Sequence, residues 1–490
     1  MSTPAVSPSA DLPPEEFRAA GYAVIDRLVD HFASLTSATD QPTVFPTTTP
    51  VELAPLFDAP VPEHGESLDT IIADWEAKIL PNSSIQGHPR FFAWVNGGGS
   101  QVGTLADALA SGLNPNLGGW RAAQSGVVIE NLTIRWLAEL LGLARETAGL
   151  FVSGGTMANT AALRMALSRA ATWDLAGEGL QSPERPRQLT IYMADHEWHV
   201  SFTKAVDLLG LGRNTIRLVP SRADFTIDPV ALDAMLDADI AAGMTPFAIV
   251  GHAGSINVGA IDDLDALAGI SERRGLWLHV DGACGALGAM LPELRHRYRG
   301  MERADSVSFD AHKWMGVPYE CGVLLSRDPA MMRRAFGVTA SYLHEQPDAE
   351  LERYDFFDRG PQMSRGFRAL KVWMSLRHHG AEGYRGFFRQ TIDCARHLHA
   401  LVEAAPDFEV VQPEPALYIY AFRYNPGGLD DAALDALNTR IAEAIRMRGV
   451  ALVMTTRVRG RVCQRFSIAN HRTTRADVTA VLEAMREMAT

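Results

Sequence analysis

Between residues 149 and 309, short apolar segments alternate with amphipathic stretches, and this alternation restricts the possible folds more than any other feature of the chain. Six segments have the length and composition of buried strands: 149–152, 189–194, 215–219, 247–251, 276–280 and 306–309. Most are followed by a helical pattern, such as those over 157–170 and 264–274. Strands linked by helices form a mostly parallel sheet with helices on both faces. The predicted fold class is therefore α/β.

The regions on either side of this alternation have a different character. Residues 1–12 are rich in Ser and Pro and are predicted to be disordered, while helical patterns cover 13–37, 68–80 and 103–143. After residue 383 we expect a long helix, strands near 408–411 and 417–423, and a final helix. We predict an N-terminal helical segment over 1–85, a large domain over 86–382 and a small α+β domain over 383–490.

Composition excludes several classes of protein. A net charge of −13 is opposite to the basic surface that general nucleic-acid binding requires. The four cysteines lie far apart without a CxxC pair, which predicts neither a disulfide framework nor a metal site and indicates a reducing compartment. The first residues lack the basic and apolar regions of a signal peptide, and no stretch has the roughly 18 apolar residues of a membrane helix. We expect a cytoplasmic protein.

The residues just after the predicted strands are candidates for a ligand site, because ligands bind beyond the carboxyl ends of strands in open α/β sheets. The segment SGGTMAN, residues 153–159, follows the first strand and opens a helix. Glycines at such a turn let backbone N–H groups approach an anion, and the helix N-terminus favours negative charge. A phosphate cradle is one interpretation. A tight turn that only needs glycine is the other.

Two more strand ends carry chemically informative residues. Asp281 follows the strand 276–280, where a carboxylate can cap a helix, bind a metal or pair with a pyridinium nitrogen. Lys313 follows the strand 306–309, and lysine rarely lies buried without a partner. Desolvation lowers the pKa of a lysine and frees its amine to attack a carbonyl. An exposed lysine just past the strand is the alternative.

Together these features resemble one family. An anion cradle, a pyridinium partner and a Schiff-base lysine in one α/β domain match the requirements of pyridoxal 5'-phosphate (PLP). The chain resembles the group II PLP-dependent amino-acid decarboxylases, which include aromatic-L-amino-acid, glutamate and histidine decarboxylases. The resemblance runs from about residue 15 to the end. It depends on these segments: DAHKW at 310–314, HVDGA at 279–283, SGGTMAN at 153–159, GHPRFF at 87–92, SRGFRALKVW at 364–373 and FSIANHRTT at 466–474.

The resemblance implies a PLP-dependent transferase-like fold of type I, as in aspartate aminotransferase, and it assigns roles to particular residues. Lys313 would hold the cofactor, Asp281 would bind the pyridinium nitrogen, and His199, or His196 if the register differs by one, would stack on the ring. The other residues implied to contact the cofactor are Gly155, Thr156, Met157, His252, Ala283, Ser306 and His312. His252 stands where many relatives have threonine, and Gly282 where alanine is usual.

The reaction type depends most on Tyr342. In the resembled family a mobile loop carries a tyrosine that protonates the carbanion left after carbon dioxide departs, and SYLHEQPDAELERYD at 341–355 resembles that loop. Phenylalanine at this position would indicate an aldehyde synthase, whereas tyrosine indicates plain decarboxylation. Transamination, desulfuration and a non-catalytic PLP-binding role are the remaining alternatives.

The substrate is less constrained than the reaction. The segment FFAWVNGGGS at 91–100 departs from the patterns of both aromatic-specific and glutamate-specific relatives. The aromatic residues Phe91, Phe92, Trp94 and Trp120 favour an aromatic amino acid, with core packing as the alternative, and Arg90 is a weaker indication of an acidic or non-standard substrate. The resemblance also implies a homodimer with its active site at the subunit interface, clasped by the N-terminal helices.

Overall fold

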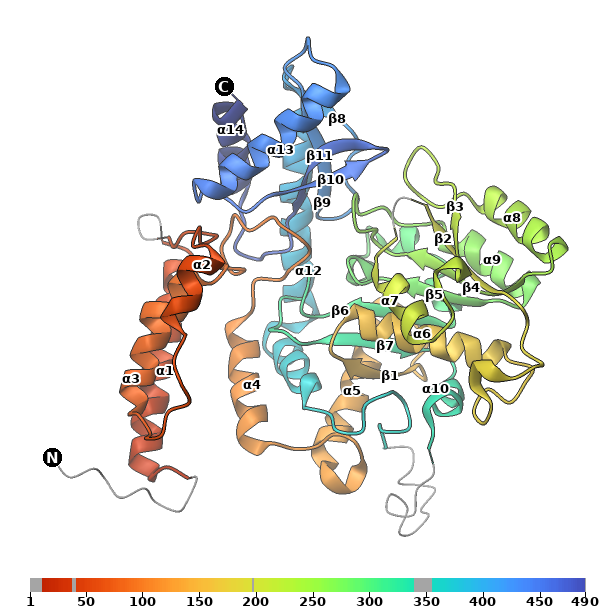
Figure 1. The fold of residues 1–490 in the computed structure, drawn as a ribbon, viewed down its shortest axis with the longest axis horizontal. Coiled ribbons are helices and arrows are strands. Elements are labelled where there is room, and N and C mark those ends of the chain that lie inside the picture. Colours follow the sequence, from red (N-terminus) through yellow and green to blue (C-terminus); the bar gives the residue numbers. More distant parts are fainter. Residues whose placement is uncertain (1–10, 38–40, 196–197, 339–354, 490) are drawn as a thin grey trace.

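The computed structural model describes residues 11–37, 41–195, 198–338 and 355–489. Within these ranges two β-sheets are surrounded by helices (Figure 1). No helix in the described ranges combines the length and the apolar character that crossing a membrane requires. The segment 1–12, predicted to be disordered, lies outside the described residues except for its last two positions.

The large sheet has seven strands in the order β1-β7-β6-β5-β4-β2-β3. Six of them are the strands expected from the sequence, within a few residues at each end. All neighbouring strands pair in parallel except those that pair with β7, which is antiparallel to both β1 and β6. The strands are β1 Ala148–Val152, β2 Leu189–Ala194, β3 Ile216–Val219, β4 Thr245–His252, β5 Trp277–Asp281, β6 Ser306–Asp310 and β7 Gly322–Ser326.

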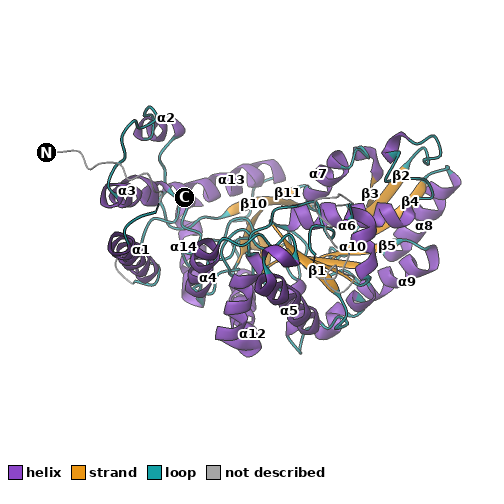
Figure 2. Ribbon diagram, turned by 90° about the horizontal axis from the view of Figure 1, so that it is seen from below, coloured by secondary structure: helices purple, strands orange, loops and turns teal. Residues whose placement is uncertain are grey.

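The connecting helices cover both faces of this sheet, which confirms the predicted α/β class. The connection from β1 to β2 runs in the opposite direction along the sheet from the connections β3–β4 and β4–β5, and right-handed crossovers therefore place α6 on one face and α8 and α9 on the other (Figure 2). These helices are α5 Gln124–Leu141, α6 Gly155–Ala170, α7 Ser201–Leu208, α8 Pro229–Ala241, α9 Leu264–Arg274 and α10 Pro329–Phe336.

The C-terminal part forms a four-stranded antiparallel sheet in the order β10-β11-β9-β8. Its strands are β8 Phe408–Val410, β9 Ile419–Tyr424, β10 Met454–Val458 and β11 Arg461–Ser467, and its helices are α12 Arg368–Glu403, α13 Asp431–Met447 and α14 Arg475–Ala489. The helix α12 links the two sheets and is interrupted at Gly380, whose φ of 66° is non-helical. The predicted domain boundary at 383 falls three residues after this kink, and the division into three regions stays a prediction.

The N-terminal helices α1 Pro14–Ser34 and α3 Leu68–Asp74 lie side by side at one margin of the molecule (Figures 1 and 2). The short α2 Pro50–Leu53 lies between them in the sequence, and α4 Gln101–Leu113 follows them. Although α1 carries the apolar positions expected from the sequence, none of its residues is buried in this chain. Phe17, Tyr22 and Val29 are 69%, 67% and 56% exposed.

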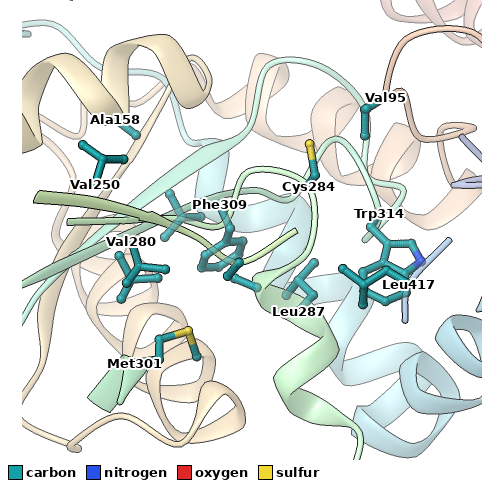
Figure 3. Packing of buried hydrophobic residues seen from close by; sticks show 14 of the residues in the cluster. Val95, Ala158, Val250, Val280, Cys284, Leu287, Met301, Phe309, Trp314 and Leu417 are labelled. Atoms are coloured by element: carbon teal, nitrogen blue, oxygen red, sulfur yellow. The ribbon is translucent and has the colours of Figure 1, made fainter. Parts of the chain in front are cut away.

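One hydrophobic core extends from the large sheet into the small one. It includes Val250 and Val280 between the strands and helices, Phe309 on β6, and Trp314 and Leu417 toward the C-terminal sheet (Figure 3). Because Trp314 directly follows Lys313, this continuous packing fixes the backbone that carries the lysine.

Candidate functional site

A cavity of about 640 Å³ opens at the carboxyl edge of the large sheet. Residues that follow β1, β5 and β6 line one side of it, and residues of β10 and β11 line another. Thr456 on β10 donates a hydrogen bond from Oγ1 to Asn257 Oδ1 at 2.6 Å, which joins the small sheet to the loop after β4. The cavity therefore lies where the two sheets meet.

The glycine turn after β1 forms the start of α6. Gly155 and Thr156 are the first two residues of the helix, where backbone N–H groups have no acceptor within the helix. Met157 also lines the cavity, but its N–H donates to Gly154 O at 3.0 Å. The N–H groups of Gly155 and Thr156 and the positive end of the helix dipole thus meet the requirements of an anion site.

Asp281 ends β5 with both carboxylate oxygens hydrogen-bonded. Oδ1 accepts from Ala283 N–H at 3.0 Å, and Oδ2 accepts from Asn159 Nδ2 at 3.0 Å. Burial raises the pKa of this carboxyl, but the neighbouring His252 and His279 and the N–H of Ala283 outweigh burial and lower the pKa overall. An ionised carboxylate at this position can hold a pyridinium proton.

A chain of hydrogen bonds behind Asp281 has one consistent direction. Trp277 Nε1 donates to Ser306 Oγ at 2.8 Å. Because Asn159 Oδ1 can only accept, a neutral His279 carries its hydrogen on Nε2 and accepts at Nδ1 from the Ser306 hydroxyl at 2.9 Å. His279 Nε2 donates to Asn159 Oδ1 at 3.0 Å. Ser308 Oγ donates to the same Oδ1 at 2.8 Å, and the Asn159 amide nitrogen is left to face Asp281 and Ser201. This chain fixes the orientation of the Asn159 amide.

His279 takes part in this chain as a neutral side chain. It is fully buried, and burial lowers its pKa to about 4. A neutral imidazole has one donor and one acceptor, and both are used here.

Lys313 lines the cavity after β6 with its Nζ 2.9 Å from Asp310 Oδ2. The sequence interpretation expected burial to lower the pKa of this lysine. Burial does act in that direction, but the charges of Asp310 and Asp281 and the hydrogen bond to Asp310 reverse it, so the pKa of Lys313 is raised in the cofactor-free chain. The nearby carboxylate, which the sequence interpretation left out, accounts for the difference.

The two neighbours of Lys313 in the chain contact different parts of the molecule. His312 is buried and accepts a hydrogen bond at Nδ1 from Cys321 N–H at 3.0 Å, and burial lowers its pKa to about 4. Trp314 donates from Nε1 to Thr391 Oγ1 on α12 at 2.9 Å, and its ring packs 4.5 Å from that of Tyr418. The segment DAHKW thus joins the large sheet to the C-terminal part.

The histidine candidates differ in position. His199 lines the cavity, and its Nδ1 accepts from Ser201 N–H at 3.2 Å, while burial lowers its pKa. His196 lies outside the described residues. His252 is buried at the end of β4 in register with Asp281, but its ring turns toward Asp262, with Nδ1 3.3 Å from Oδ2, and the described cavity lining does not include it.

Of Ala283 and Ser306, both expected to contact the cofactor, only Ala283 lines the cavity. Gly282 leaves no room for the alanine that is usual there, since a Cβ would lie 2.3 Å from Ala286 Cβ. Ser306, expected near a phosphate, is the first residue of β6 and hence lies at the far end of the strand from Lys313. Its hydroxyl serves the buried chain to His279 instead.

The four aromatic candidates for substrate contact are not brought together. Trp94 lines the cavity and is 47% exposed. Phe91 and Phe92 are buried in the hydrophobic core, with Phe92 stacked 4.7 Å from Phe466, and Trp120 lies in a short helical turn before α5. None of these three belongs to the described lining of the cavity. Tyr342 falls in the range 339–354, outside the described residues.

Several residues of the site were missed by the sequence interpretation. Asn159 and Asp310 are letters of the motifs SGGTMAN and DAHKW, so the motifs themselves carried the signal. Tyr319 lines the cavity and donates from its hydroxyl to Asn96 Oδ1 at 2.7 Å, and Arg465 donates from NH1 to Trp94 O at 2.8 Å. These two come from a loop and from the other sheet, and no local pattern indicates their proximity.

The segment 91–100 has a clear structural role. Gly97 N–H donates to His312 O at 3.2 Å, and a Cβ at Gly97 would lie 2.1 Å from Lys313 O. Glycine is therefore required where this segment crosses the backbone of the lysine.

The residues present fit PLP. An amine can bond its aldehyde, a carboxylate can pair with its ring nitrogen, and a glycine turn at a helix N-terminus can hold its phosphate. The glycine at 155 matters for this fit, since a Cβ there would lie 2.9 Å from Asp310 Oδ2 and crowd the cradle.

Comparison with known proteins agrees with this chemistry. The model of the pyridoxal-dependent decarboxylase conserved domain matches residues 50–425. An aromatic-L-amino-acid decarboxylase of Bacillus atrophaeus is 30% identical over 485 residues, covering 99% of this chain and 98% of that protein. A phenylacetaldehyde synthase of Petunia hybrida is 28% identical, covering 93% and 91%. The crystal structure of Oryza sativa TDC with PLP and tryptamine superposes with a TM-score of 0.89 at 26% identity, covering 98% and 99%.

Proposed function

The chain belongs to the pyridoxal-dependent decarboxylase family, and from this premise we propose that it converts an aromatic L-amino acid to the corresponding amine and carbon dioxide. The cofactor is PLP. The observation that carries the proposal is the convergence of Lys313, Asp281 and the N-terminus of α6 on one cavity. The Bacillus atrophaeus relative and the tryptamine in the Oryza sativa structure support the aromatic class.

In the proposed reaction the bond between Cα and the carboxylate breaks, its electron pair stays on Cα, and a proton replaces the departing carbon dioxide. Bound PLP supplies a conjugated ring that accepts this electron pair. Asp281 would keep a proton on the ring nitrogen, since His252, His279 and the N–H of Ala283 lower the pKa of its own carboxyl. Lys313 would hold the cofactor, and His199, which lines the same cavity, would cover its ring.

Contacts to the substrate are proposed on the basis of the cavity lining. Trp94 and Tyr319 offer aromatic surface, and Arg465 offers a positive charge to the substrate carboxylate. Tyr342 is proposed to return the proton to Cα.

An aldehyde synthase is the second candidate, because the Petunia hybrida relative carries that name. Incubation of the PLP-loaded protein with twenty L-amino acids, with measurement of carbon dioxide, amine and peroxide, separates the two. We expect amine and carbon dioxide in equal amounts without peroxide from an aromatic substrate. Aldehyde with peroxide would overturn the decarboxylase proposal. Turnover of acidic amino acids alone would overturn the proposal of an aromatic substrate.

The role of Tyr342 has its own test. Tyr342→Phe removes the proposed proton donor, so we expect dioxygen to be consumed and the amine to be replaced by aldehyde, ammonia and hydrogen peroxide. A variant that still produces amine cleanly would contradict this role.

We further propose a homodimer in a reducing, cytoplasmic location. The exposed apolar residues of α1, namely Phe17, Tyr22, Val24, Ile25 and Val29, support burial of this helix against a second subunit. The four cysteines are all buried and free, which suits a reducing compartment. Light scattering at micromolar concentration tests the dimer, and a monomer with full activity would contradict it.

A further inference from the structure

The carboxyl group of Asp310 has an unusual environment that the proposed chemistry does not use. The residue ends β6 and is 2% exposed. Oδ2 pairs with Lys313 Nζ at 2.9 Å, whereas Oδ1 is buried without a hydrogen-bond partner among the described residues. An acceptor in that state costs free energy unless a ligand or a proton occupies it.

This carboxyl group lies against the anion cradle. A Cβ at Gly155 would be 2.9 Å from Oδ2, and a Cβ at Gly322 would be 2.9 Å from Oδ1. The absence of side chains at both glycines is what allows the carboxyl to approach the turn that begins α6. A phosphate held by the N–H groups of Gly155 and Thr156 would therefore have a carboxyl group beside it, and two anions in contact disfavour each other.

The positive charge that balances Asp310 comes from Lys313. His312 cannot take its place near neutral pH, since burial lowers its pKa to about 4 and its Nε2 is 3.8 Å away from Oδ2. When Lys313 bonds the cofactor, the amine nitrogen passes two hydrogens to the aldehyde oxygen as water. The nitrogen would keep one hydrogen and its positive charge. It would then offer Asp310 at most one N–H, where the free amine at 2.9 Å offers three.

We propose that Asp310 takes up one proton when PLP binds, and that the resulting carboxyl O–H donates a hydrogen bond to the cofactor phosphate. The bond between Lys313 and the cofactor neither consumes nor releases a net proton, so this uptake is additional. Asp310 thus alternates between a counter-ion for the free lysine and a hydrogen-bond donor for the phosphate. The inference rests on the proposed function only in requiring PLP as the cofactor.

The groups that face Asp310 come from several elements. Lys313, His312, Tyr319 and Cys321 follow it in the chain, Cys284 comes from the turn after β5, Tyr418 precedes β9, and His199 precedes α7. Burial and Asp310 itself raise the pKa of Tyr319 to about 12 and that of Cys321 in the same direction, so both stay neutral. The cradle residues Gly154 and Gly155 have no side chain to titrate.

The experiment is a calorimetric titration of the cofactor-free protein with PLP at pH 8, in two buffers with different ionisation enthalpies. The difference in heat gives the number of protons taken up. At a pH where Lys313 is protonated in both proteins before PLP binds, Asp310→Asn should take up one proton fewer than the wild type, since an amide cannot be protonated in this way. The control is Glu320→Gln, which neutralises another cavity-lining carboxylate that pairs with Arg368 at 3.5 Å and does not touch the cradle. Its proton uptake should equal that of the wild type.

The pH dependence of PLP affinity gives a second measure. Above neutral pH the wild-type affinity should fall with a slope that is steeper by about tenfold per pH unit than that of Asp310→Asn. Equal slopes and equal proton uptake would overturn the proposal. Failure of PLP to bind at all, shown by the missing cofactor absorbance, would instead contradict the proposed function.

A measurement on the wild type removes the dependence on a variant that folds. Infrared difference spectra before and after PLP binding should gain a protonated-carboxyl C=O band, and labelling the aspartate carboxyls with carbon-13 should shift it. A spectrum without such a band would overturn the proposal even if Asp310→Asn could not be purified.

Discussion

Asp281 and Asp310 end neighbouring parallel strands at the same edge of one sheet, yet their carboxylates are held in different ways. Asp281 has both oxygens satisfied by fixed donors, Ala283 N–H and Asn159 Nδ2. Asp310 has one oxygen on the movable charge of Lys313 and one without a partner in the described part of the chain. Donors of the protein thus hold the Asp281 carboxylate in position for a cation. The Asp310 carboxyl, by contrast, is proposed to change its protonation when the cofactor binds.

The largest expected effect comes from removing Lys313, whose ammonium pairs with Asp310. Lys313→Ala should lower kcat by about 10⁴-fold or more, because the amine that bonds the cofactor is lost. Lys371→Met is a suitable control, since this buried lysine pairs with Asp107 at 2.8 Å outside the cavity. The control should retain the cofactor absorbance that Lys313→Ala loses. Residual turnover near the wild-type rate would contradict the role of Lys313.

The comparison itself is tested by neutralising each aspartate. Asp281→Asn should lower kcat by about 10²- to 10⁴-fold, because the ring nitrogen loses the carboxylate that keeps it protonated. Asp310→Asn should have a much smaller effect on kcat at neutral pH, since an amide can still donate to the phosphate. Steady-state kinetics at saturating PLP measure both. The reverse order of the two effects would show that the roles are exchanged.

A smaller effect is expected at His279, which contacts Asn159 and does not line the cavity. His279→Leu removes the donor to Asn159 Oδ1 and the acceptor for Ser306, so the Asn159 amide is free to turn away from Asp281. We expect kcat to fall by about tenfold, as for outer partners of charged ligands. His279→Gln keeps a donor at the position of Nε2 and should recover most of the loss. Equal losses in both variants would indicate that packing alone, and not the hydrogen bond, is needed.

The same histidine predicts how stability changes with pH. The pKa of His279 is about 4 in the folded chain against 6.5 in an ordinary histidine, so the unfolded chain binds the proton first as pH falls. The free energy of unfolding should therefore decrease between pH 6.5 and about 4, by about 3 kcal/mol for this group. His279→Gln should make this decrease shallower in urea unfolding at several pH values. An unchanged pH profile would mean that the pKa of His279 is the same in the folded and unfolded chains.

The smallest effect is expected at Trp314. Trp314→Phe removes the hydrogen bond to Thr391 Oγ1 and part of the contact with Tyr418, which should lower the free energy of unfolding by about 1–2 kcal/mol. The cofactor absorbance should remain, since Lys313 is unchanged. Denaturant unfolding measures the first quantity. Loss of cofactor binding would show that this anchor positions the lysine as well as stabilising the fold.

The sequence predicted the parts of the molecule that depend on local pattern. Alternation of strands and helices was sufficient for six strands of the large sheet, and the strand ends led to Asp281, Lys313 and the glycine turn. β7 was not predicted. This five-residue apolar segment follows a loop after Lys313, and no helical pattern precedes it. Ser306 was misplaced, although it begins the predicted strand 306–309 and the rule that ligands bind at carboxyl ends places it away from the site. Tyr319, Arg465 and β10 reach the cavity through contacts between distant segments, which no local pattern contains.

The continuous core that passes through Phe309, Trp314 and Leu417 has a consequence for how the molecule unfolds. Two sheets that share one core lose their packing together, so heating should give one cooperative calorimetric transition and not two. A fragment that ends near residue 382 would expose the apolar surface around Trp314 and would aggregate instead of folding alone. Bound PLP, although it contacts only the edge of the sheets, should accordingly protect amide hydrogens from exchange as far away as α13 and α14.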